Sequence, residues 1–205
     1  MQCASKPKWI CVEGPDRVGK SSLVKNLISY LESQEIPVKH MAFPVRTGVT
    51  GKMLHDYLTN QGSNPLPDAT RGQVLHLTFV ANRWEHLPTI QEYLKQGYWV
   101  IMDRWSASGV VYSASRGIDF HWAYQAENGL PSPDMTLLLE ADPAILATRP
   151  GWGEEREENI DMQRRVQENF RKFYTETPNR ACRIVLSENT REEDVFIMAR
   201  NTIFQ

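Results

Sequence analysis

The chain has 205 residues, 41% hydrophobic and 23% charged, proportions typical of a folded domain with its own core. Its 25 acidic and 23 basic residues leave a net charge of −2, so there is no basic surplus to indicate nucleic acid or an anionic membrane as a partner. Cys3, Cys11 and Cys182 match neither a disulfide framework nor a zinc motif, and no apolar run approaches the roughly 18 residues of a membrane span. We expect a soluble cytoplasmic protein, with the nucleus as a second location, that binds no nucleic acid and no membrane.

Short apolar runs alternate with segments of helical periodicity, the pattern of a parallel sheet covered by helices on both faces. The predicted strands are residues 9–13, 38–43, 98–103, 135–140 and 183–186. Because no repeat, low-complexity tract or long linker divides the sequence, we expect one three-layer α/β domain over residues 1–205.

Four segments have the apolar spacing of helices. Residues 20–32 place five apolar side chains on one stripe. Residues 70–96 are apolar nearly all round, which predicts a largely buried helix that Pro88 breaks or kinks. Helical spacing returns from Met162 to Tyr174 and from Glu192 to Ile203. Residues 60–68 contain one Gly and two Pro, which predicts a loop. Residues 149–158 contain two Gly, one Pro and six charged residues, and we interpret this second loop as a lid.

Residues 14–21, GPDRVGKS, form a complete G-x-x-x-x-G-K-S motif between the first predicted strand and the first predicted helix. In such a phosphate-binding loop the glycines let backbone N–H groups converge on one phosphate, and the start of the helix adds its dipole. Lys20 would reach the β- and γ-phosphates, and Ser21 would ligate Mg²⁺. The motif predicts a nucleotide site, with a glycine-rich turn that binds no ligand as the alternative.

GTPases, mechanical ATPases and small kinases all share this loop. The residues that would bind a phosphate acceptor must therefore distinguish between these classes. The sequence lacks the Asn-Lys-x-Asp motif of switch GTPases and is short for a mechanical ATPase. Planar donors suited to a phosphate are found at Arg17, Arg46, Arg83 and Arg104, and two of them follow predicted strands. Ligands of open α/β sheets bind at the carboxyl ends of the strands. For any one of these arginines alone, a surface salt bridge is a better explanation than phosphate binding. Their shared placement reverses that preference and predicts a site for a phosphate acceptor.

These motifs, in order, resemble those of the thymidylate kinase family from about Trp9 to the last helix. They are the phosphate loop with its internal Asp-Arg, FPxR at 43–46 with GK at 51–52, FxANRWE at 79–85, DR at 103–104 with SG at 108–109, and GLPxPD at 129–134. The resemblance implies a P-loop NTPase-type fold with a short lid, ATP and dTMP as substrates, Mg²⁺ as cofactor and a homodimer. The arginine inside the loop, Arg17, makes the sequence similar to the eukaryotic and poxviral branch of the family.

The resemblance also implies roles for residues on the donor side. The catalytic residues would be Arg17, Lys20, Asp103 and Arg104. ATP would contact Gly14, Asp16, Arg17, Val18, Gly19, Lys20, Ser21 and Ser22 of the loop, and Arg149 of the lid would lie against its adenine. Ser21 would ligate Mg²⁺, and Asp103 would orient the ion through water.

On the acceptor side, the resemblance implies that Asp16 binds the 3′-hydroxyl of dTMP and that Arg46 and Arg104 hold its phosphate. Base and sugar contacts would come from Phe43, from Phe79 by stacking, from Arg83 to a thymine carbonyl, from Ser108 at the base edge and from Tyr112 at the 2′ face. Core packing is the alternative for Phe79 and Tyr112, and a loop cap is the alternative for Asp16.

Three residues depart from the family pattern. Trp105 stands where the family has Tyr or His, Ala107 where it has Phe, and Glu157 where it has a lid Tyr. We interpret Trp84, Trp99 and Trp122 as packing residues.

The expected reaction is transfer of the γ-phosphoryl group of MgATP to dTMP for dTTP synthesis. The alternatives are a kinase for UMP, CMP or dUMP, or a nucleotide-binding switch without catalysis.

Overall fold

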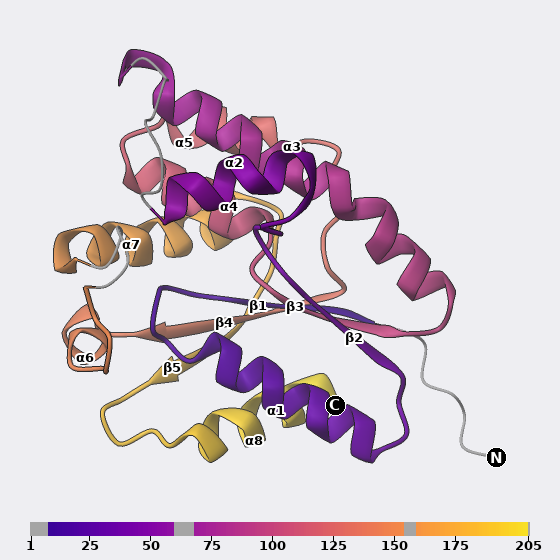
Figure 1. The fold of residues 1–205 in the computed structure, drawn as a ribbon. Helices are drawn as coiled ribbons and strands as arrows, with labels where there is room; N and C mark the ends of the chain where they lie inside the picture. Colours follow the sequence, from indigo (N-terminus) through magenta and orange to yellow (C-terminus); the bar gives the residue numbers. More distant parts are fainter. Residues whose placement is uncertain (1–7, 60–67, 154–158, 205) are drawn as a thin grey trace.

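The five apolar runs form one parallel sheet in the computed structural model, which describes residues 8–59, 68–153 and 159–204 (Figure 1). The strands are β1 (Trp9–Glu13), β2 (Val38–Ala42), β3 (Trp99–Asp103), β4 (Met135–Ala141) and β5 (Cys182–Leu186). They lie in the order β2-β3-β1-β4-β5, and each neighbouring pair is parallel. The central strands are almost wholly buried and the edge strands half exposed, as expected for a sheet covered on both faces.

Helices α1 (Lys20–Ser33) and α8 (Glu192–Ile203) cover one face of the sheet (Figure 1). Their apolar stripes meet β1, β3 and β4 in a core that includes Leu23, Leu27 and Val195. The other face carries α2 (Gly48–Leu58), α3 (Asp68–Lys95), α4 (Ser106–Ser115), α5 (Phe120–Ala126) and α7 (Ile160–Glu176). The short α6 (Pro143–Ala147) follows β4. The three-layer α/β fold is confirmed.

The strand order puts the carboxyl ends of β1, β2 and β3 side by side. Asp103 is in register with Val12 of β1 and with Ala42 of β2. The phosphate loop, the Arg46 segment and the Asp103-Arg104 pair therefore leave the sheet at one edge, between α1 and the helices of the opposite face.

Helix α3 corrects two expectations from the sequence. Of the predicted break or kink at Pro88, the break is wrong: α3 continues to Lys95, because the ring lies on the exposed side, where water can bond the carbonyl that lacks an N–H partner. It is also not largely buried, since Leu77 is 48% and Trp84 44% exposed. Trp122 is 36% exposed, so of the three tryptophans interpreted as packing only Trp99 is a core residue.

Two predicted loops lie partly or wholly outside the described residues. Residues 60–67 are not described, nor are residues 154–158, which include Glu157 and most of the predicted lid. None of the described helices combines the length and the apolar character that a bilayer crossing requires.

Candidate active site

The phosphate loop depends on glycine at both of its ends. Gly14 has φ +145°, and a Cβ built there would lie 2.5 Å from the carbonyl oxygen of Leu139 in β4. Gly19, with φ +102°, is the left-handed residue immediately before α1. Both positions favour glycine strongly, which explains the spacing of the motif. The loop curls over the start of α1 and presents the positive end of that helix.

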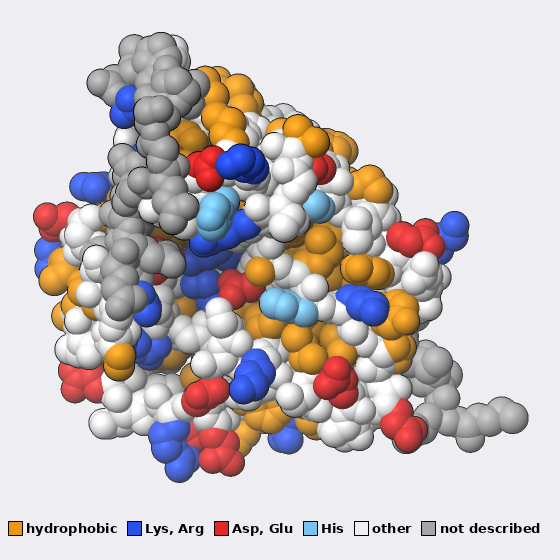
Figure 2. Space-filling view, in the orientation of Figure 1, with side chains coloured by type: hydrophobic (Ala, Val, Ile, Leu, Met, Phe, Trp, Pro, Cys, Tyr) orange, Lys and Arg blue, Asp and Glu red, His pale blue; other side chains and the backbone are white. Residues whose placement is uncertain are grey.

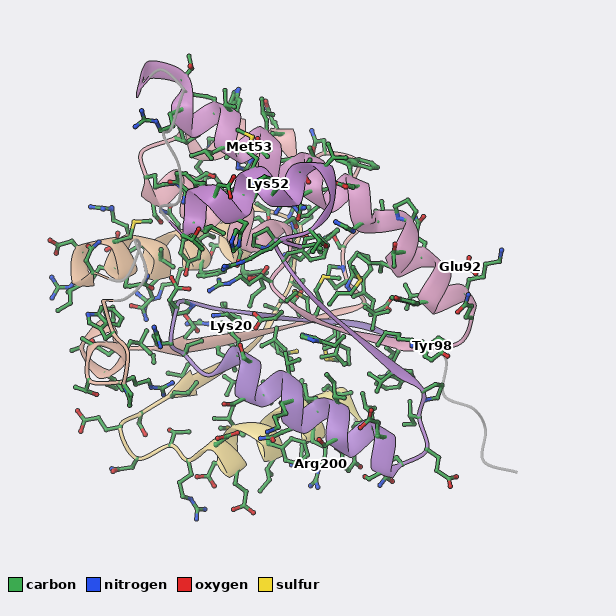
Figure 3. All side chains as sticks on the ribbon, in the orientation of Figure 1. Lys20, Lys52, Met53, Glu92, Tyr98 and Arg200 are labelled. Carbon is green, nitrogen blue, oxygen red and sulfur yellow. The ribbon has the colours of Figure 1, made fainter. Side chains whose placement is uncertain are left out.

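Lys20 is a desolvated cation at the start of α1 (Figure 3). It is 6% exposed, and its Nζ donates a 2.6 Å hydrogen bond to the carbonyl of Pro15. Burial, together with the nearby Arg104 cation, lowers the pKa of Lys20 to about 8. A bound phosphate would offset both effects, so the ammonium group suits an anionic ligand.

Two arginines join the phosphate loop to the segment after α6. Nη1 of Arg17 donates to the carbonyl of Pro150 at 3.2 Å, and Nη1 of Arg149 donates to the carbonyl of Arg17. Arg17 has φ +60°, a strained backbone conformation for a residue other than glycine. This crossed pair holds the first residues of the predicted lid over the loop.

Ser21 and Asp103 meet at the end of β3. The Ser21 hydroxyl donates to Asp103 Oδ2 at 3.0 Å, while Asp103 Oδ1 is buried without a hydrogen-bond partner among the described residues. Mg²⁺ takes one or two oxygen ligands from a protein and the rest from phosphates and water. A hydroxyl beside an incompletely bonded carboxylate fits that ion.

Arg104 connects the loop to the opposite side of the cleft. Its φ is +70°, and its Nη1 donates to the carbonyl of Gly14 and to the Ser108 hydroxyl, both at 3.1 Å. Its Nη2 bonds the Asp16 carboxylate, and its guanidinium carbon lies 5.1 Å from the centre of the Tyr112 ring. Burial alone would raise the pKa of Asp16, but the Arg104 and Lys20 cations lower it, so the carboxylate stays charged.

These groups surround one cleft of about 680 Å³. Figure 2 shows Lys and Arg side chains gathered in a hollow of this face. The cleft brings together most of the residues singled out in the sequence: Asp16, Arg17, Gly19, Lys20, Ser21, Ser22, Phe43, Arg46, Phe79, Arg83, Asp103, Arg104, Ser108, Tyr112 and Arg149. Gly14 and Val18 do not line it. The Val18 side chain is fully buried in the core beneath the loop, which leaves only its backbone for a nucleotide.

Helix α3 braces the Arg46 side of the cleft with polar residues of its FxANRWE segment. Asn82 accepts a hydrogen bond from Val45 N at 2.9 Å and donates one to Val45 O at 3.0 Å, next to Arg46. Glu85 accepts bonds from Val49 N and Thr50 N at the start of α2. The segment therefore fixes the backbone around Arg46.

Comparison with known proteins accounts for this arrangement. The thymidylate kinase family model matches residues 12–196. A thymidylate kinase of Schizosaccharomyces pombe is 39% identical over 196 residues, covering 95% of this chain and 90% of that protein. A thymidylate kinase of Dictyostelium discoideum is 39% identical over 163 residues, covering 79% and 71%.

The chain belongs to the thymidylate kinase family. A solved thymidylate kinase of Candida albicans superposes with a TM-score of 0.82 at 30% identity, covering 97% of this chain and 91% of that one. One from Ehrlichia chaffeensis, at 21% identity and a TM-score of 0.73 over 96% and 98% of the two chains, shares the fold.

Two site residues of this family member had no motif to mark them. Glu13 is 1% exposed and accepts bonds from Trp105 N, Ser108 N and Ser108 Oγ at 2.8, 3.2 and 2.5 Å, so it anchors the start of α4. Burial raises its pKa. Gln163 of α7 donates to Asp16 Oδ2 at 3.2 Å. An acidic residue in an otherwise apolar strand was the available signal for Glu13, whereas Gln163 is an ordinary polar residue of a helix.

The family departure at Trp105 is accommodated by packing. Its ring is 2% exposed and makes edge contacts with Trp9 at 5.1 Å and Phe43 at 4.8 Å between centroids. Its Nε1 donates to Pro131 O at 3.0 Å. Trp105 therefore forms part of the wall of the cleft and supports Phe43. Ala107, the second departure, lies in the core between α4 and α7.

Proposed function

We propose that this thymidylate kinase family member transfers the γ-phosphoryl group of MgATP to dTMP, giving ADP and dTDP for dTTP synthesis, as one nucleoside monophosphate kinase domain over residues 1–205. The observation that carries this proposal is the single cleft that joins the phosphate loop to the arginines of the acceptor side. The reaction needs positioning and charge neutralisation rather than a covalent intermediate, and the cleft supplies cations at both ends.

On the donor side we assign the β- and γ-phosphates to Lys20 and to the backbone N–H groups between Gly14 and Ser22. Arg17 is assigned to the migrating phosphoryl group, where a cation strengthens its contact as charge spreads in the transition state. Arg149 is assigned to the adenine. The described geometry supports these roles because the two guanidinium groups already span the gap between the loop and the segment after α6.

Mg²⁺ is the expected cofactor, held by Ser21 and, through water, by Asp103. When bound it would neutralise charge on the phosphates. Within the described part of the chain there is no group of three or more His, Cys, Asp or Glu residues that could hold a metal on its own.

On the acceptor side we assign the phosphate of dTMP to Arg46 and Arg104, and the 3′-hydroxyl to Asp16. Base and sugar contacts are assigned to Phe43, Phe79, Arg83, Ser108 and Tyr112, all of which line the cleft. The ring of Tyr112 packs against Arg104, which would place it beside the sugar. A bulky ring there favours a 2′-deoxyribose.

We also propose a homodimer through α3. Four apolar residues of this helix, Leu77, Ala81, Trp84 and Pro88, are all exposed and follow at spacings of four, three and four residues. Such a stripe lies on one side of a helix, and hydrophobic side chains reach the surface along α3 in Figure 2. The opposite side of α3 carries Arg83 into the cleft and Asn82 against the backbone of Val45, next to Arg46, so a second copy would steady that side.

The location we propose is the cytoplasm, with the nucleus as a second compartment. Cys11 and Cys182 are both free thiols in the fold, the form that a reducing compartment maintains.

ADP production from ATP, measured with dTMP, dUMP, UMP, CMP, AMP and GMP as acceptors, tests the function. We expect kcat/KM for dTMP to exceed that for UMP by at least about two decades, the scale of combined steric and polar discrimination. Comparable efficiency with UMP or CMP would assign the protein to another pyrimidine nucleotide. ATP binding without transfer to any acceptor would indicate a nucleotide-binding switch.

A further inference from the structure

A buried ion pair lies behind the wall of the acceptor site. Arg83 of α3 donates from Nε to Oε2 of Glu127 at 2.9 Å and from Nη2 to Oε1. Arg83 is 3% and Glu127 6% exposed, and Glu127 is the C-cap residue that follows α5. Two parallel bonds from a planar guanidinium to a carboxylate fix the position and the plane of the arginine.

This pairing determines which nitrogen of Arg83 remains for a ligand. Glu127 accepts the N–H of Nε and one N–H of Nη2, so Nη1 is the guanidinium nitrogen that has no bond to Glu127. Arg83 lines the cleft together with Phe79 and Gly109, where the N–H groups of Nη1 are available to a ligand. Without the carboxylate, the flexible arginine side chain would have several positions available. A fixed donor can discriminate between ligands, whereas a mobile one adapts to them.

The surroundings hold the pair in place from two sides. A Cβ built on Gly109 would lie 2.4 Å from Arg83 Nη2 and 2.8 Å from Glu127 Oε1, so any side chain at that position would displace the pair. On the other side, His76 Nε2 lies 3.8 Å from Glu127 Oε1. Burial, and then the Arg83 cation, lower the pKa of His76 to about 4, so its ring is neutral and Arg83 is the cation that balances Glu127.

A serine, a histidine and a carboxylate follow one another in space here, as in a hydrolytic triad: Ser113, His76 and Glu127. They are too deeply buried to reach a substrate. Nδ1 of His76 lies 2.8 Å from the Ser113 hydroxyl, and its Nε2 lies 2.9 Å from the carbonyl of Ala123. His76 and Ser113 are both 0% exposed. This cluster is therefore part of the buried packing beside the ion pair and does not act on a ligand.

We propose that Glu127 is a positioning residue that sets base selectivity, by holding Arg83 Nη1 against the group at C4 of the acceptor base. A guanidinium group only donates hydrogen bonds, so it attracts the C4 carbonyl of thymine or uracil and disfavours the C4 amino group of cytosine. The inference rests on the proposed function, since it concerns the acceptor site of the same kinase.

The test compares dUMP with dCMP, whose bases have the same shape and differ in the C4 group and the protonation of N3. In Glu127→Gln we expect kcat/KM for dUMP to fall about tenfold or more through KM, with kcat within about threefold, because one charged contact orients the donor. The preference for dUMP over dCMP should shrink by about tenfold or more. The ratio of dTMP to dUMP, which reports the methyl group, should stay within about twofold of wild type.

Glu140→Gln is the matched control. Glu140 is 3% exposed and accepts a 2.5 Å bond from Arg183 on the neighbouring strand, outside the cleft. Removing that carboxylate should leave both ratios unchanged. Gly109→Ala displaces the ion pair without uncovering a charge, and it should reduce the dUMP-to-dCMP preference in the same direction as Glu127→Gln.

The outcomes separate the two claims. A wild-type protein with no transfer to dTMP or dUMP would overturn the proposed function, and this inference with it. An active wild type and a folded Glu127→Gln variant with unchanged dUMP-to-dCMP preference would overturn the role of Glu127 alone. If Glu127→Gln does not fold, the preference in Gly109→Ala decides in the same way.

Discussion

Arg17 combines a strained backbone with a place in the lining of the cleft. Its φ of +60° is a conformation that glycine adopts readily, so the arginine is retained there at some cost in stability. We expect Arg17→Gly to lower kcat by about three decades or more, the range for an arginine that stabilises a phosphoryl-transfer transition state. KM for ATP and for dTMP should change by under about tenfold, and the melting temperature should not fall.

Glu35→Gly provides the matched backbone control, because Glu35 also has a positive φ, +58°, and is exposed at the end of α1. It should leave both kinetic constants unchanged. A preserved kcat with a raised KM for ATP in Arg17→Gly would make Arg17 a ground-state anchor. The catalytic cation would then be sought at Arg149 or Arg156.

At the same scale, motif residues were predictable and their supports were not. Arg46, Arg83 and Arg104 stand in recognisable sequence contexts, and the structure brings all three to one cleft. Glu13, Glu127 and Gln163 act through partners 95, 44 and 147 residues away along the chain. No local spacing reports such contacts, because they arise only when the strands are ordered.

At the scale of elements, α3 fixes α2. The Glu85 carboxylate accepts bonds from Val49 N at 2.9 Å, from Thr50 N at 3.1 Å and from the Thr50 hydroxyl at 2.6 Å. Gly48 before them has φ +85°, and a Cβ there would lie 2.5 Å from Glu85 Oε1. A carboxylate at this end of a helix also complements its dipole.

These bonds lower the pKa of Glu85 from 4.5 to about 2. The folded state thus binds the proton less tightly than the unfolded state does. The charged carboxylate therefore makes its full contribution to the stability of the folded state above about pH 4.5, and this contribution is lost as the pH falls toward 2. We expect Glu85→Gln to melt below wild type at pH 7, and the difference to close between pH 4.5 and 2 in thermal unfolding followed by circular dichroism.

Glu92→Gln, toward the far end of the same helix, is the control (Figure 3). Glu92 accepts a bond from the Gln96 side chain at 2.8 Å, and no hydrogen bond joins it to α2 among the described residues. Its variant should show no such pH dependence. A Glu85→Gln difference that stays constant over this range would mean that the carboxylate charge does not hold α2.

A helix could be predicted from the sequence where the contacts that stabilise it lie within the helix itself. The expected bounds of α8 are those observed, because three acidic residues open the helix and Asp194 caps Arg191 N at 3.2 Å. Helix α4, with the sequence SASGVVYSAS, is rich in Ser and Gly, which are weak helix formers. Its start is bonded to Glu13 of β1 instead, and that contact is invisible in the sequence of α4.

At the scale of the whole molecule, the alternation of strands and helices predicted the layers but not the strand order. The site exists because β1 lies between β3 and β4, which places the phosphate loop beside Asp103. The remaining misfit is α3, whose apolar composition predicts burial while Leu77 and Trp84 stay exposed in a single chain. A second copy of the chain would resolve that misfit.

The dimer is tested at Leu77, the first residue of the exposed stripe of α3. A charge there would be buried without a partner in the interface, which costs several kcal/mol, on the order of the free energy that separates a stable dimer from monomers. At micromolar concentration we expect wild type to sediment at twice the chain mass of 23.6 kDa and Leu77→Glu at that mass itself. Ile197→Glu on α8 changes a residue that is also exposed, 38%, but lies on the opposite face of the sheet, so this variant should stay dimeric.

Because Arg83 follows on the inner side of the same helix, the monomeric Leu77→Glu variant should keep its kcat and lose affinity for dTMP. A wild-type protein that sediments as a monomer would leave the α3 stripe without this partner and overturn the homodimer.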